Sequence, residues 1–559
     1  MDDVKIKSYK TFDLWLNNVD DSLKNELLTI KSNENELIDR FYKDLEFGTG
    51  GMRGKIGIGS NRMNFYTVAR ASQGFANYLK KIKDFPSIVI AYDTRNKSDY
   101  FAKNAAQVFA ANGINVYLFS EPTATPILSY AVRYLKADGG IVITASHNPA
   151  EYNGYKVYTS NGVQAVPNIA EKIIEEVNKL DYFKDINIIK YEEGINNEKI
   201  IELDNEVYNN YIDEVEGYVR TLVPEINNNL KIVYTPLHGT GFKPVSEILK
   251  KLDFNIEIVE EQAKRDINFS TVKSPNPEEK EAFKLGLSLA KKSNADIVLA
   301  TDPDSDRIGV FEKYNNDYIS FNGNEMGIML SHFILSKLKL HNLLPQNGII
   351  VKTIVSTDMI KPIAQHFNVS VDETLTGFKF IGEKIEEYKF NRKNKFIFGF
   401  EESYGYLANE HARDKDAVIA SALISVMASE LKKEEKTLKM YLNELYEKYG
   451  YYKEKLMTFT FEGYSGAQKI RNIMEKIKNE PPIKISSFRL LETIDYNKGH
   501  NNLPKSNVIE LRYGSIKLIA RPSGTEPKIK FYILVNSDSE EKALNLISDV
   551  ELIIFNLIN

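Results

Sequence analysis

The sequence of 559 residues contains no cysteine. This absence excludes disulfides, thiolate nucleophiles and cysteine-ligated metal sites, and it is compatible with a reducing cytoplasm. A strong net charge is also missing, since the formal charge is −5 at pH 7 and the pI is near 6.0. The overall charge therefore does not attract the chain to nucleic acid or to an anionic membrane. An anionic substrate has to be bound by local lysine and arginine side chains.

Long apolar runs are absent as well. No stretch of about 18 apolar residues indicates a membrane span. The first residues, MDDVKIKSYKTFDLWL, lack the apolar core and the cleavage site of a signal peptide. Hydrophobic residues make up 43% and charged residues 27% of the chain, as in globular proteins. We therefore expect a soluble, cytoplasmic protein of several domains; the oligomeric state stays open.

Seven apolar, β-rich runs each end in a polar or glycine-rich loop. Short runs of this kind indicate strands buried on both faces, as in parallel or mixed α/β sheets. Helical patterns lie between many of them, and alternation of strand and helix predicts an α/β fold. The expected strands are 87–95, 139–149, 230–241, 295–307, 348–359, 395–405 and 516–528, and the clearest helices are 100–112, 278–294 and 414–435.

Changes in composition suggest four domains. Polar, Asn-rich stretches near 185–205 and 313–325 look like linkers, and the chain becomes aromatic and rich in Lys and Glu after about 440. We place the domains at 1–205, 206–320, 321–440 and 441–559. In open α/β sheets ligands gather outside the carboxyl ends of the strands, where these polar loops lie. The loops are therefore candidates for one cleft.

The segment DPDSDR carries alternating carboxylates at Asp302, Asp304 and Asp306. An EF-hand calcium loop is excluded, because it needs glycine and glutamate where this sequence has Arg307 and Lys313. Three carboxylates beside an arginine suit Mg²⁺ bound together with a phosphate. The alternative is a solvated acidic turn, but three clustered like charges repel one another unless a cation neutralises them.

The segment RPSGTEPK, 521–528, offers an arginine, two hydroxyls, a glycine and a lysine. These are phosphate-binding groups, although the pattern is no Walker A loop and a plain turn explains it equally well. In GFEESYGY, 399–406, Glu401 and Ser403 could accept from and donate to sugar hydroxyls, or simply form a turn. Lys379 stands between two phenylalanines, which suits either an acid or base of lowered pKa or a lysine that snorkels to the surface.

Two segments of the N-terminal part complete the set. FGTGGMRGKIGIGSNRMN, 47–64, is a glycine-rich, cationic stretch that suggests either a flexible anion-binding loop or a mobile connection. ITASHNPAEYNGYK, 143–156, places Ser146 and His147 directly after an apolar run. Either the serine is a nucleophile with the histidine as its base, or both residues belong to a turn. The second reading is reasonable because Asn-Pro and serine are common in turns. The local sequence leaves both readings open.

TASHNP, DPDSDR, GFEESYG and RPSGTEP, in this order, together resemble the α-D-phosphohexomutase superfamily of phosphoglucomutases and phosphomannomutases. Three segments, FGTGGMRG, TGFKFIGEKI and GFEESYGYL…DKDAV, are most similar in sequence to motifs of one branch of the superfamily, which contains bacterial α-phosphoglucomutases and phosphopentomutase-like enzymes. The resemblance covers nearly the whole chain. It implies an α/β protein of four domains around a central cleft, with three similar mixed-sheet domains and a smaller C-terminal α+β domain.

The resemblance implies a role for each motif. Ser146 would carry a phosphoryl group, and Mg²⁺ would bind to Asp302, Asp304 and Asp306 with the phosphoserine completing the site. The residues that would read the sugar hydroxyls or hold the non-reacting phosphate are Glu401, Ser403, Arg521, Ser523, Gly524, Thr525 and Lys528.

The resemblance also implies roles in the transfer itself. Arg53 and Arg307 would stabilise the transferring phosphoryl group. Lys156 and Lys379 match positions proposed as general acid or base in relatives, and His147 would orient or assist. Two departures stand out. Ser305 replaces a glycine found in many relatives, and Phe378 stands near where some bacterial relatives place a histidine, which favours Lys379 as the acid.

The implied activity is an isomerase reaction, in which a hexose 1-phosphate and its 6-phosphate interconvert through a phosphoserine and a sugar 1,6-bisphosphate that also serves as activator. The wording of the motifs favours glucose phosphate. Alternatives are phosphopentomutase, phosphomannomutase or glucose 1,6-bisphosphate synthase activity. A Mg²⁺-dependent phosphatase or kinase is a further rival. A non-catalytic sugar-phosphate-binding protein is disfavoured, because simple binding needs neither Ser146 nor all three aspartates.

Overall fold

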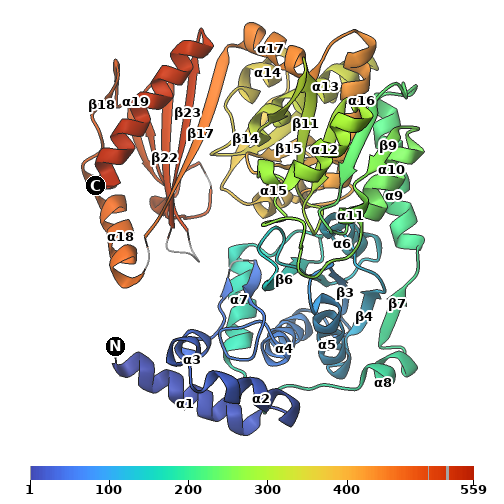
Figure 1. The fold of residues 1–559 in the computed structure, drawn as a ribbon, viewed down its shortest axis with the longest axis vertical. Coiled ribbons are helices and arrows are strands. Elements are labelled where there is room, and N and C mark those ends of the chain that lie inside the picture. The colour runs from blue at the N-terminus through green and yellow to red at the C-terminus, as the bar shows by residue number, and fades with distance from the viewer. Residues whose placement is uncertain (1, 49, 462, 502, 524–527, 559) are drawn as a thin grey trace. The chain divides into compact units, whose positions relative to one another are not determined.

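The computed structural model describes residues 2–48, 50–461, 463–501, 503–523 and 528–558 (Figure 1). The chain divides into two compact units. The first consists of Met1–Ser320, Gly382–Glu387 and Gly405–Ser429, and the second of Phe321–Ile381, Tyr388–Tyr404 and Glu430–Asn559. The four domain boundaries predicted from composition stay a prediction.

The first unit contains a mixed sheet of seven strands. Four parallel strands lie side by side in it, and the other three run antiparallel to their neighbours. The order is β1 (Phe47–Gly48), β2 (Gly51–Lys55), β6 (Tyr152–Thr159), β5 (Gly139–Ile143), β3 (Ser87–Tyr92), β4 (Asn115–Phe119) and β7 (Ile200–Leu203). The helices of this region are α4 (Phe65–Ile82), α5 (Ser98–Ala111), α6 (Thr125–Tyr134), α7 (Pro167–Asn178) and α8 (Tyr191–Asn196).

Three N-terminal helices support the glycine-rich segment 47–64. They are α1 (Asp2–Asn18), α2 (Asp21–Ile30) and α3 (Glu34–Phe41). Arg40 of α3 donates to the Ile58 carbonyl at 3.1 Å, and the Ile58 amide donates to Glu26 of α2 at 3.1 Å. Arg62 pairs with Asp39 at 2.5 Å and is nearly fully buried. The segment predicted as a flexible loop therefore contains the paired strands β1 and β2 and a turn in which Ile58 and Arg62 are bonded to α2 and α3.

A second sheet of the first unit has five strands. Their order is β12 (Asp317–Phe321), β11 (Ile308–Tyr314), β10 (Ile297–Thr301), β8 (Lys231–Thr235) and β9 (Asn255–Ile258). Its helical elements are α9 (Glu206–Leu222), α10 (Phe242–Lys251), α11 (Glu260–Ala263), η1 (Lys280–Phe283) and α12 (Lys284–Ser293). The helix expected over 278–294 is therefore split into a 3₁₀ turn and an α-helix. The segment with β16 (Gly405–Ala408) and most of α16 (Ala417–Lys433) also belongs to this unit.

The second unit combines an α/β part with an antiparallel sheet. In the α/β part, β14 (Ser370–Thr374), β13 (Gly348–Thr353) and β15 (Lys395–Glu401) are parallel neighbours. Its helices are α13 (Gly323–Leu340), α14 (Ile360–His366), most of α15 (Phe378–Asn391) and α17 (Leu438–Tyr449). The C-terminal sheet has the order β17 (Tyr451–Thr460), β23 (Lys528–Ser537), β22 (Ile516–Pro522), β21 (Ile509–Arg512) and β20 (Glu492–Asp495), beside the short hairpin of β18 (Lys484–Ile485) and β19 (Phe488–Arg489) and the 3₁₀ turn η2 (Tyr496–Lys498).

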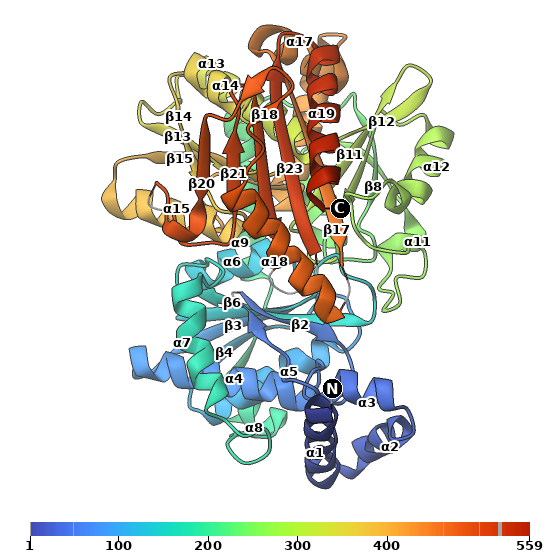
Figure 2. The same ribbon diagram turned by 90° about the vertical axis from the view of Figure 1, so that its left-hand side faces the viewer.

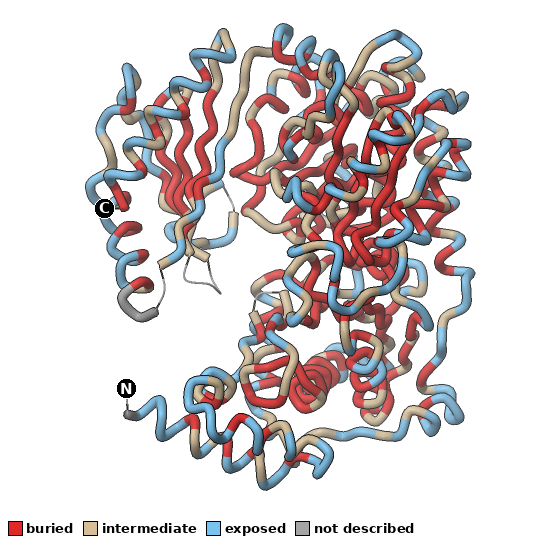
Figure 3. Tube along the Cα trace, in the orientation of Figure 1, coloured by how far each residue is buried: buried red, intermediate tan, exposed pale blue. Residues whose placement is uncertain are grey.

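Two helices, α18 (Gly463–Asn479) and α19 (Glu540–Ile558), cover one face of the C-terminal sheet (Figure 2). All seven apolar runs form strands, and most of their residues are buried (Figure 3). The run at 516–528 differs from expectation, because its strand β22 lies in a wholly antiparallel sheet. It is still buried on both faces, since Lys517, on the face opposite the helices, contacts Asp358 of the α/β part at 2.7 Å.

Candidate active site

Ser146 lies in the turn that joins β5 to β6 in the first unit. Its backbone has φ +51°, a left-handed conformation that is unfavourable for a residue with a Cβ atom. Its amide donates to the Thr144 hydroxyl at 2.8 Å, and its own hydroxyl donates to Asp302 Oδ2 at 2.7 Å. His147 Nδ1 lies 3.2 Å from the same hydroxyl. The segment is thus a turn, and that turn presents a buried serine hydroxyl to a carboxylate.

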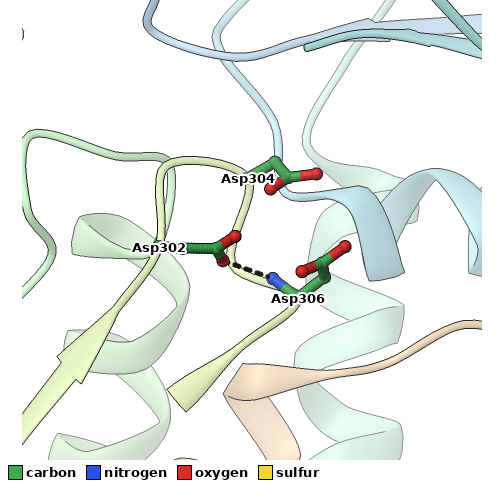
Figure 4. Close-up of side chains that lie close together, drawn as sticks. All are labelled: Asp302, Asp304 and Asp306. Atoms are coloured by element: carbon green, nitrogen blue, oxygen red, sulfur yellow. Dashed lines mark hydrogen bonds between the residues drawn. The ribbon is translucent and has the colours of Figure 1, made fainter. Parts of the chain in front are cut away.

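The three aspartates of DPDSDR converge in the loop between β10 and β11 (Figure 4). All three are buried, and one carboxylate oxygen from each lies within 4.8 Å of the others. Asp302 Oδ1 also accepts the amides of Asp306 and Arg307, both at 3.0 Å, which fixes the loop. Ser305 adopts φ +57° and is fully buried. This conformation suits the glycine of many relatives, and the serine leaves the aspartates together.

Two lysines contact the aspartates from other segments of the same unit. Lys156 of β6 lies 2.6 Å from Asp304 Oδ2 and 3.2 Å from Asp306 Oδ2. Lys415, which follows β16, lies 3.2 Å from the same Asp306 oxygen. Asp304 is also bound by the Thr125 hydroxyl at 2.8 Å. Two of the three acids therefore contact ammonium groups, and the third, Asp302, contacts the Ser146 hydroxyl.

Burial and charge perturb these groups in opposite directions. Burial, with Asp306 and Asp304 nearby, raises the pKa of Asp302 well above its usual value. Burial would also raise the pKa of Asp306, but Lys415, Lys156 and Arg307 outweigh it and hold the value below the usual range. Burial opposes the charge of Lys156, yet Asp304 and Asp306 raise its pKa above the ordinary value. Lys156 is therefore protonated at neutral pH and can donate a proton.

The aspartate cluster fits a divalent cation. Asp304 Oδ1 and Asp306 Oδ1 are buried, and neither has a hydrogen-bond partner among the residues that the structure describes. A buried carboxylate oxygen without a partner is costly. Mg²⁺ prefers oxygen ligands and is usually held by few carboxylates. The donor set and its two unsatisfied oxygens therefore match a metal site of the Mg²⁺ type.

The other predicted residues of the first unit surround this cluster. Arg53 of β2 donates to Asn148 Oδ1 at 2.9 Å, in the loop that carries Ser146. Arg307 pairs with Glu278. Burial, with the Arg307 and Arg53 guanidinium groups, holds the pKa of His147 well below its usual value. A neutral imidazole at this position can orient a hydroxyl but carries no charge.

The second unit holds the remaining predicted residues. Glu401, at the end of β15, accepts the amide of Gly377 at 2.9 Å. Gly377 has φ +118° and directly precedes α15, whose first turn contains Lys379. The ammonium group of Lys379 lies 5.4 Å from the centroid of the Phe380 ring. Ser403 lies in the turn after β15. The segments of Glu401 and Lys379 therefore meet within this unit.

The predicted phosphate loop is described at its two ends only. Arg521 lies near the end of β22, and the Ser523 amide donates to the carbonyl of Lys528 at 2.8 Å. Gly524 and Thr525 lie outside the described residues. Burial and the nearby Glu402 raise the pKa of Tyr532, whose hydroxyl is hydrogen-bonded to Arg521.

Sequence reasoning missed several residues of the first-unit site. Lys415 lies in DKDAV, one of the segments that resemble the family, but no role was inferred for it from the sequence. Asp414 holds this segment by accepting the Tyr158 hydroxyl at 2.7 Å. Thr125 had no signal of its own. Asp93 and Arg95, at the end of an apolar run, form a buried network around the Ser146 loop.

Comparison with known proteins agrees with this arrangement. Models of phosphoglucomutase/phosphomannomutase α/β/α domains I, II and III match residues 44–184, 209–315 and 322–449. A phosphoglucomutase of Staphylococcus haemolyticus is 40% identical over 515 residues, 90% of this chain and 92% of that protein. The phosphoglucomutase of Staphylococcus aureus strain USA300 is 39% identical over 537 residues, 93% of this chain and 95% of that protein.

Solved structures show the same fold. Parafusin, a phosphoglucomutase from Paramecium, superposes in its open form with a TM-score of 0.72 at 17% identity, covering 92% of this chain and 95% of that one. A phosphoglucomutase/phosphomannomutase family protein from Burkholderia thailandensis gives a TM-score of 0.66 at 17% identity, covering 91% and 97%. In the described part of the chain, no helix is both long and apolar enough to cross a membrane.

The mixed α/β sheets, the buried aspartates beside a serine and the matching domain models define one class: the chain belongs to the α-D-phosphohexomutase superfamily. Within that superfamily, its relatives at 38–40% identity over most of the chain are named phosphoglucomutase. The predicted fold class is confirmed, and the C-terminal sheet is consistent with a fourth domain.

Proposed function

We propose that the protein is a phosphosugar mutase that interconverts α-D-glucose 1-phosphate and glucose 6-phosphate. One observation carries the proposal: the Ser146 hydroxyl lies 2.7 Å from Asp302 in a buried aspartate cluster that has two oxygens without hydrogen-bond partners in the described residues. A serine held this way can exchange a phosphoryl group beside a cation. Glucose is favoured because the full-length relatives are named phosphoglucomutase.

Ser146 carries the phosphoryl group in the proposed cycle. The bond between phosphorus and Ser146 Oγ breaks as a sugar hydroxyl forms a new bond to phosphorus, which gives a sugar 1,6-bisphosphate. The intermediate turns over, and its other phosphoryl group returns to Ser146 Oγ. Atoms balance, because each hydroxyl that attacks loses a proton and each oxygen that leaves gains one. Bisphosphate lost to solvent is replaced from solution as activator.

Charge stabilisation comes from the cluster around Ser146. Asp302, Asp304 and Asp306 would hold Mg²⁺, which when bound offsets the charge of the transferring phosphoryl group. Arg307 and Arg53 serve the same purpose, because guanidinium groups bind phosphate oxygens in a fork. These interactions are usually the largest contribution to catalysis of phosphoryl transfer.

Proton transfer falls to the lysines. Lys156 is protonated and contacts Asp304 at 2.6 Å, and we assign it the role of the acid that protonates Oγ when the phosphoryl group leaves. Lys379 stays the alternative acid or base, and His147, being neutral, orients the Ser146 hydroxyl. Lys415 joins this set, because it contacts Asp306 as Lys156 does.

Substrate recognition is assigned to the second unit. Glu401 and Ser403 read the sugar hydroxyls in this proposal, and the Glu401 carboxylate is already positioned by the Gly377 amide. The non-reacting phosphate is held by Arg521, Ser523, Gly524, Thr525 and Lys528. A cytoplasmic location is part of the proposal, supported by the absence of cysteine.

The test compares kcat/KM for glucose, mannose and ribose 1-phosphates with glucose 1,6-bisphosphate present. We expect glucose 1-phosphate to be converted best, with no release of inorganic phosphate. Little activity on glucose 1-phosphate would contradict the assignment of glucose as the sugar. Stoichiometric release of phosphate would indicate a phosphatase. Ser146→Ala should abolish turnover and the phosphoserine mass shift of its peptide, whereas Ser160→Ala, at an exposed serine after β6, should change neither.

A further inference from the structure

Arg95 is a buried arginine that is bonded to the loop of Ser146. It lies between β3 and α5 and has no exposed surface. One end of its guanidinium, Nη2, donates to the carbonyls of Ser146 and Asn148. The other end, Nη1, donates to the carbonyls of Pro149 at 2.9 Å and Tyr152 at 3.3 Å. One side chain thus binds four carbonyls within seven consecutive residues.

Asp93 holds the same loop from its other side. Its Oδ2 accepts the Thr144 hydroxyl at 2.6 Å, and that hydroxyl in turn accepts the Ser146 amide at 2.8 Å. Asp93 Oδ2 also lies 3.3 Å from Arg95 Nε, so the acid and the arginine form an ion pair. Asp93, Thr144, Ser146 and Arg95 are therefore linked in a ring of contacts. In this ring Thr144 accepts the Ser146 amide and Arg95 donates to the Ser146 carbonyl.

This ring fixes an unfavourable backbone conformation. Ser146 has φ +51°, which residues with a Cβ atom avoid unless their surroundings impose it. Rotation toward an ordinary φ would turn the Cα–Cβ bond and carry the hydroxyl away from Asp302, now 2.7 Å distant. A hydroxyl placed by its backbone in this way depends on the groups that hold that backbone.

Arg95 is itself held rigidly. Its guanidinium lies 4.9 Å from the centroid of the Phe269 ring, and Arg265 donates to the Thr94 and Arg95 carbonyls at 3.0 and 3.2 Å. Burying a guanidinium is costly, and the cost is offset only when hydrogen bonds satisfy its donors. Here those bonds go to the carbonyls of the Ser146 loop rather than to a distant structural partner.

We propose that Arg95 is a positioning residue for phosphoryl transfer: together with Asp93 and Thr144 it holds Ser146 in the left-handed conformation that aims its hydroxyl at Asp302. The proposal rests on the proposed function of Ser146. Arg95 touches neither substrate nor metal in this role. It acts on the reaction through the backbone of the serine.

The experiment compares Arg95→Met and Arg95→Lys with Arg70→Met as matched control. Arg70 is also a buried arginine of the first unit; it donates to the Leu180 carbonyl at 3.0 Å and to Asp44 at 2.8 Å, and lies 4.3 Å from the centroid of the Tyr182 ring. It therefore reproduces the burial, the carbonyl contact, the ion pair and the aromatic contact, without reaching the serine loop. Each variant is assayed for kcat and KM with glucose 1-phosphate, for its thermal midpoint, and for phosphoserine at Ser146.

Arg95→Met should lower kcat by about 100-fold and leave KM within about threefold, because displacement of a reacting atom by an ångström has that order of effect. Arg95→Lys should recover part of this loss, since an ammonium group can reach some of the four carbonyls. Arg70→Met should lower the thermal midpoint as much while kcat per folded molecule stays near that of the wild type.

An Arg95→Met enzyme whose folded fraction keeps wild-type kcat would overturn the proposal, because the arginine would then serve stability alone. If Arg95→Met does not fold, Thr144→Val decides the matter, since it removes only the hydroxyl between Asp93 and the Ser146 amide. We expect Thr144→Val to lower kcat in the same way. An unchanged kcat would contradict the proposal that the ring positions Ser146. If the wild type does not acquire phosphoserine from glucose 1,6-bisphosphate, the proposed function itself is wrong. This result differs from a normal kcat in the variants, which would contradict only the role of Arg95.

Discussion

Two clusters of lysine and acid, one in each unit, differ in how many lysines each acid contacts. In the first unit Lys156 contacts Asp304 and Asp306, Lys415 contacts Asp306, and Asp302 accepts the Ser146 hydroxyl. In the second unit two carboxylates face three lysines. Lys352, fully buried, lies 3.0 Å from Asp358 and 3.1 Å from Glu373; Lys361 lies 2.9 Å from each acid, and Lys517 is 2.7 Å from Asp358. Each acid of the second cluster thus contacts at least two lysines, whereas Asp302 of the first cluster has a serine hydroxyl as its partner.

The clusters also differ in how completely their oxygens are matched. Both oxygens of Asp358 have a lysine nitrogen within 3.0 Å. By hydrogen-bond geometry Asp358 Oδ1 and Glu373 Oε1 are unsatisfied in the described parts of the chain, as Asp304 Oδ1 and Asp306 Oδ1 are. The two oxygens of the second cluster nevertheless have lysine nitrogens within 3.1 Å, whereas Arg307 Nε lies 3.9 Å from Asp306 Oδ1. The second cluster is an ion network that ties the α/β part to the C-terminal sheet. In the first cluster one oxygen of each aspartate lies within 4.8 Å of the others, as ligands of one cation would, and this difference separates a structural network from a candidate catalytic one.

Asp302→Asn should separate activity from stability most sharply. We expect a loss of about 1,000-fold in kcat, since electrostatic groups at the transferring phosphoryl dominate this chemistry. The thermal midpoint should hold or rise, because burial and two neighbouring acids already disfavour the charged form of Asp302 and raise its pKa. Steady-state kinetics and thermal unfolding measure the two effects, with exposed Asp84→Asn as control. A fall in midpoint with normal kcat would place Asp302 among the structural acids.

Lys352→Met should have the reverse effect. Removing it leaves Asp358 and Glu373 short of a buried partner, and breaking a buried pair costs about 3–5 kcal/mol. We expect a lower urea midpoint for the second unit, with near-normal phosphorylation of Ser146 in protein that remains folded. Exposed Lys393→Met is the matched control. An unchanged midpoint would mean that Lys361 and Lys517 suffice to balance the two acids.

The first cluster was predictable and the second was not, because their residues are spaced differently in the sequence. Asp302, Asp304 and Asp306 lie within five residues, so like-charge repulsion between neighbours in the chain is enough to indicate a cation. Lys352, Asp358 and Lys517 come from separate elements, and nothing local marks Lys517 as buried. The strands were predictable from their apolar runs for the same local reason, whereas the antiparallel pairing of β22 depends on partners distant in the chain.

The site itself shows the same limit. Ser146 stood in a motif that resembles a family, yet its φ of +51° and the four carbonyl contacts of Arg95 depend on how β3 and β5 lie side by side. Lys415 stood in a quoted motif but reaches Asp306 only because its segment packs on the first unit. The contacts of Ile58 in the glycine-rich segment 47–64 could not be predicted either, because the partners Glu26 and Arg40 precede it in separate helices.

Removal of the divalent cation should affect only the first cluster. We expect treatment with EDTA to abolish turnover and Mg²⁺ to restore it. Mg²⁺ at 100 times its Kd should stabilise the wild type by about 2.7 kcal/mol, visible as a higher thermal midpoint. Asp304→Asn should lose most of that increase while Glu373→Gln keeps it. An equal response in both variants would show that Mg²⁺ binds elsewhere.

The smallest effect concerns Glu454, a neighbour of the second cluster. Burial raises its pKa to about 7, against a hydrogen bond from Thr357 and with Glu325 and Asp358 adding to the rise. A carboxyl group whose pKa is raised on folding binds its proton more tightly in the folded state. Stability from this group is therefore full below pH 4.5, falls as pH rises toward 7, and is constant above that value.

Glu454→Gln keeps the neutral shape and should remove this dependence. We expect the variant to be more stable than the wild type by about 1–3 kcal/mol at pH 8 and equally stable at pH 4.5, because one pKa unit corresponds to about 1.4 kcal/mol. Urea unfolding at the two pH values measures the difference. A gain of the same size at both pH values would mean that ionisation of Glu454 is not its cause. A gain limited to pH 8 would show that the second unit carries one acid that it stabilises only in its protonated form.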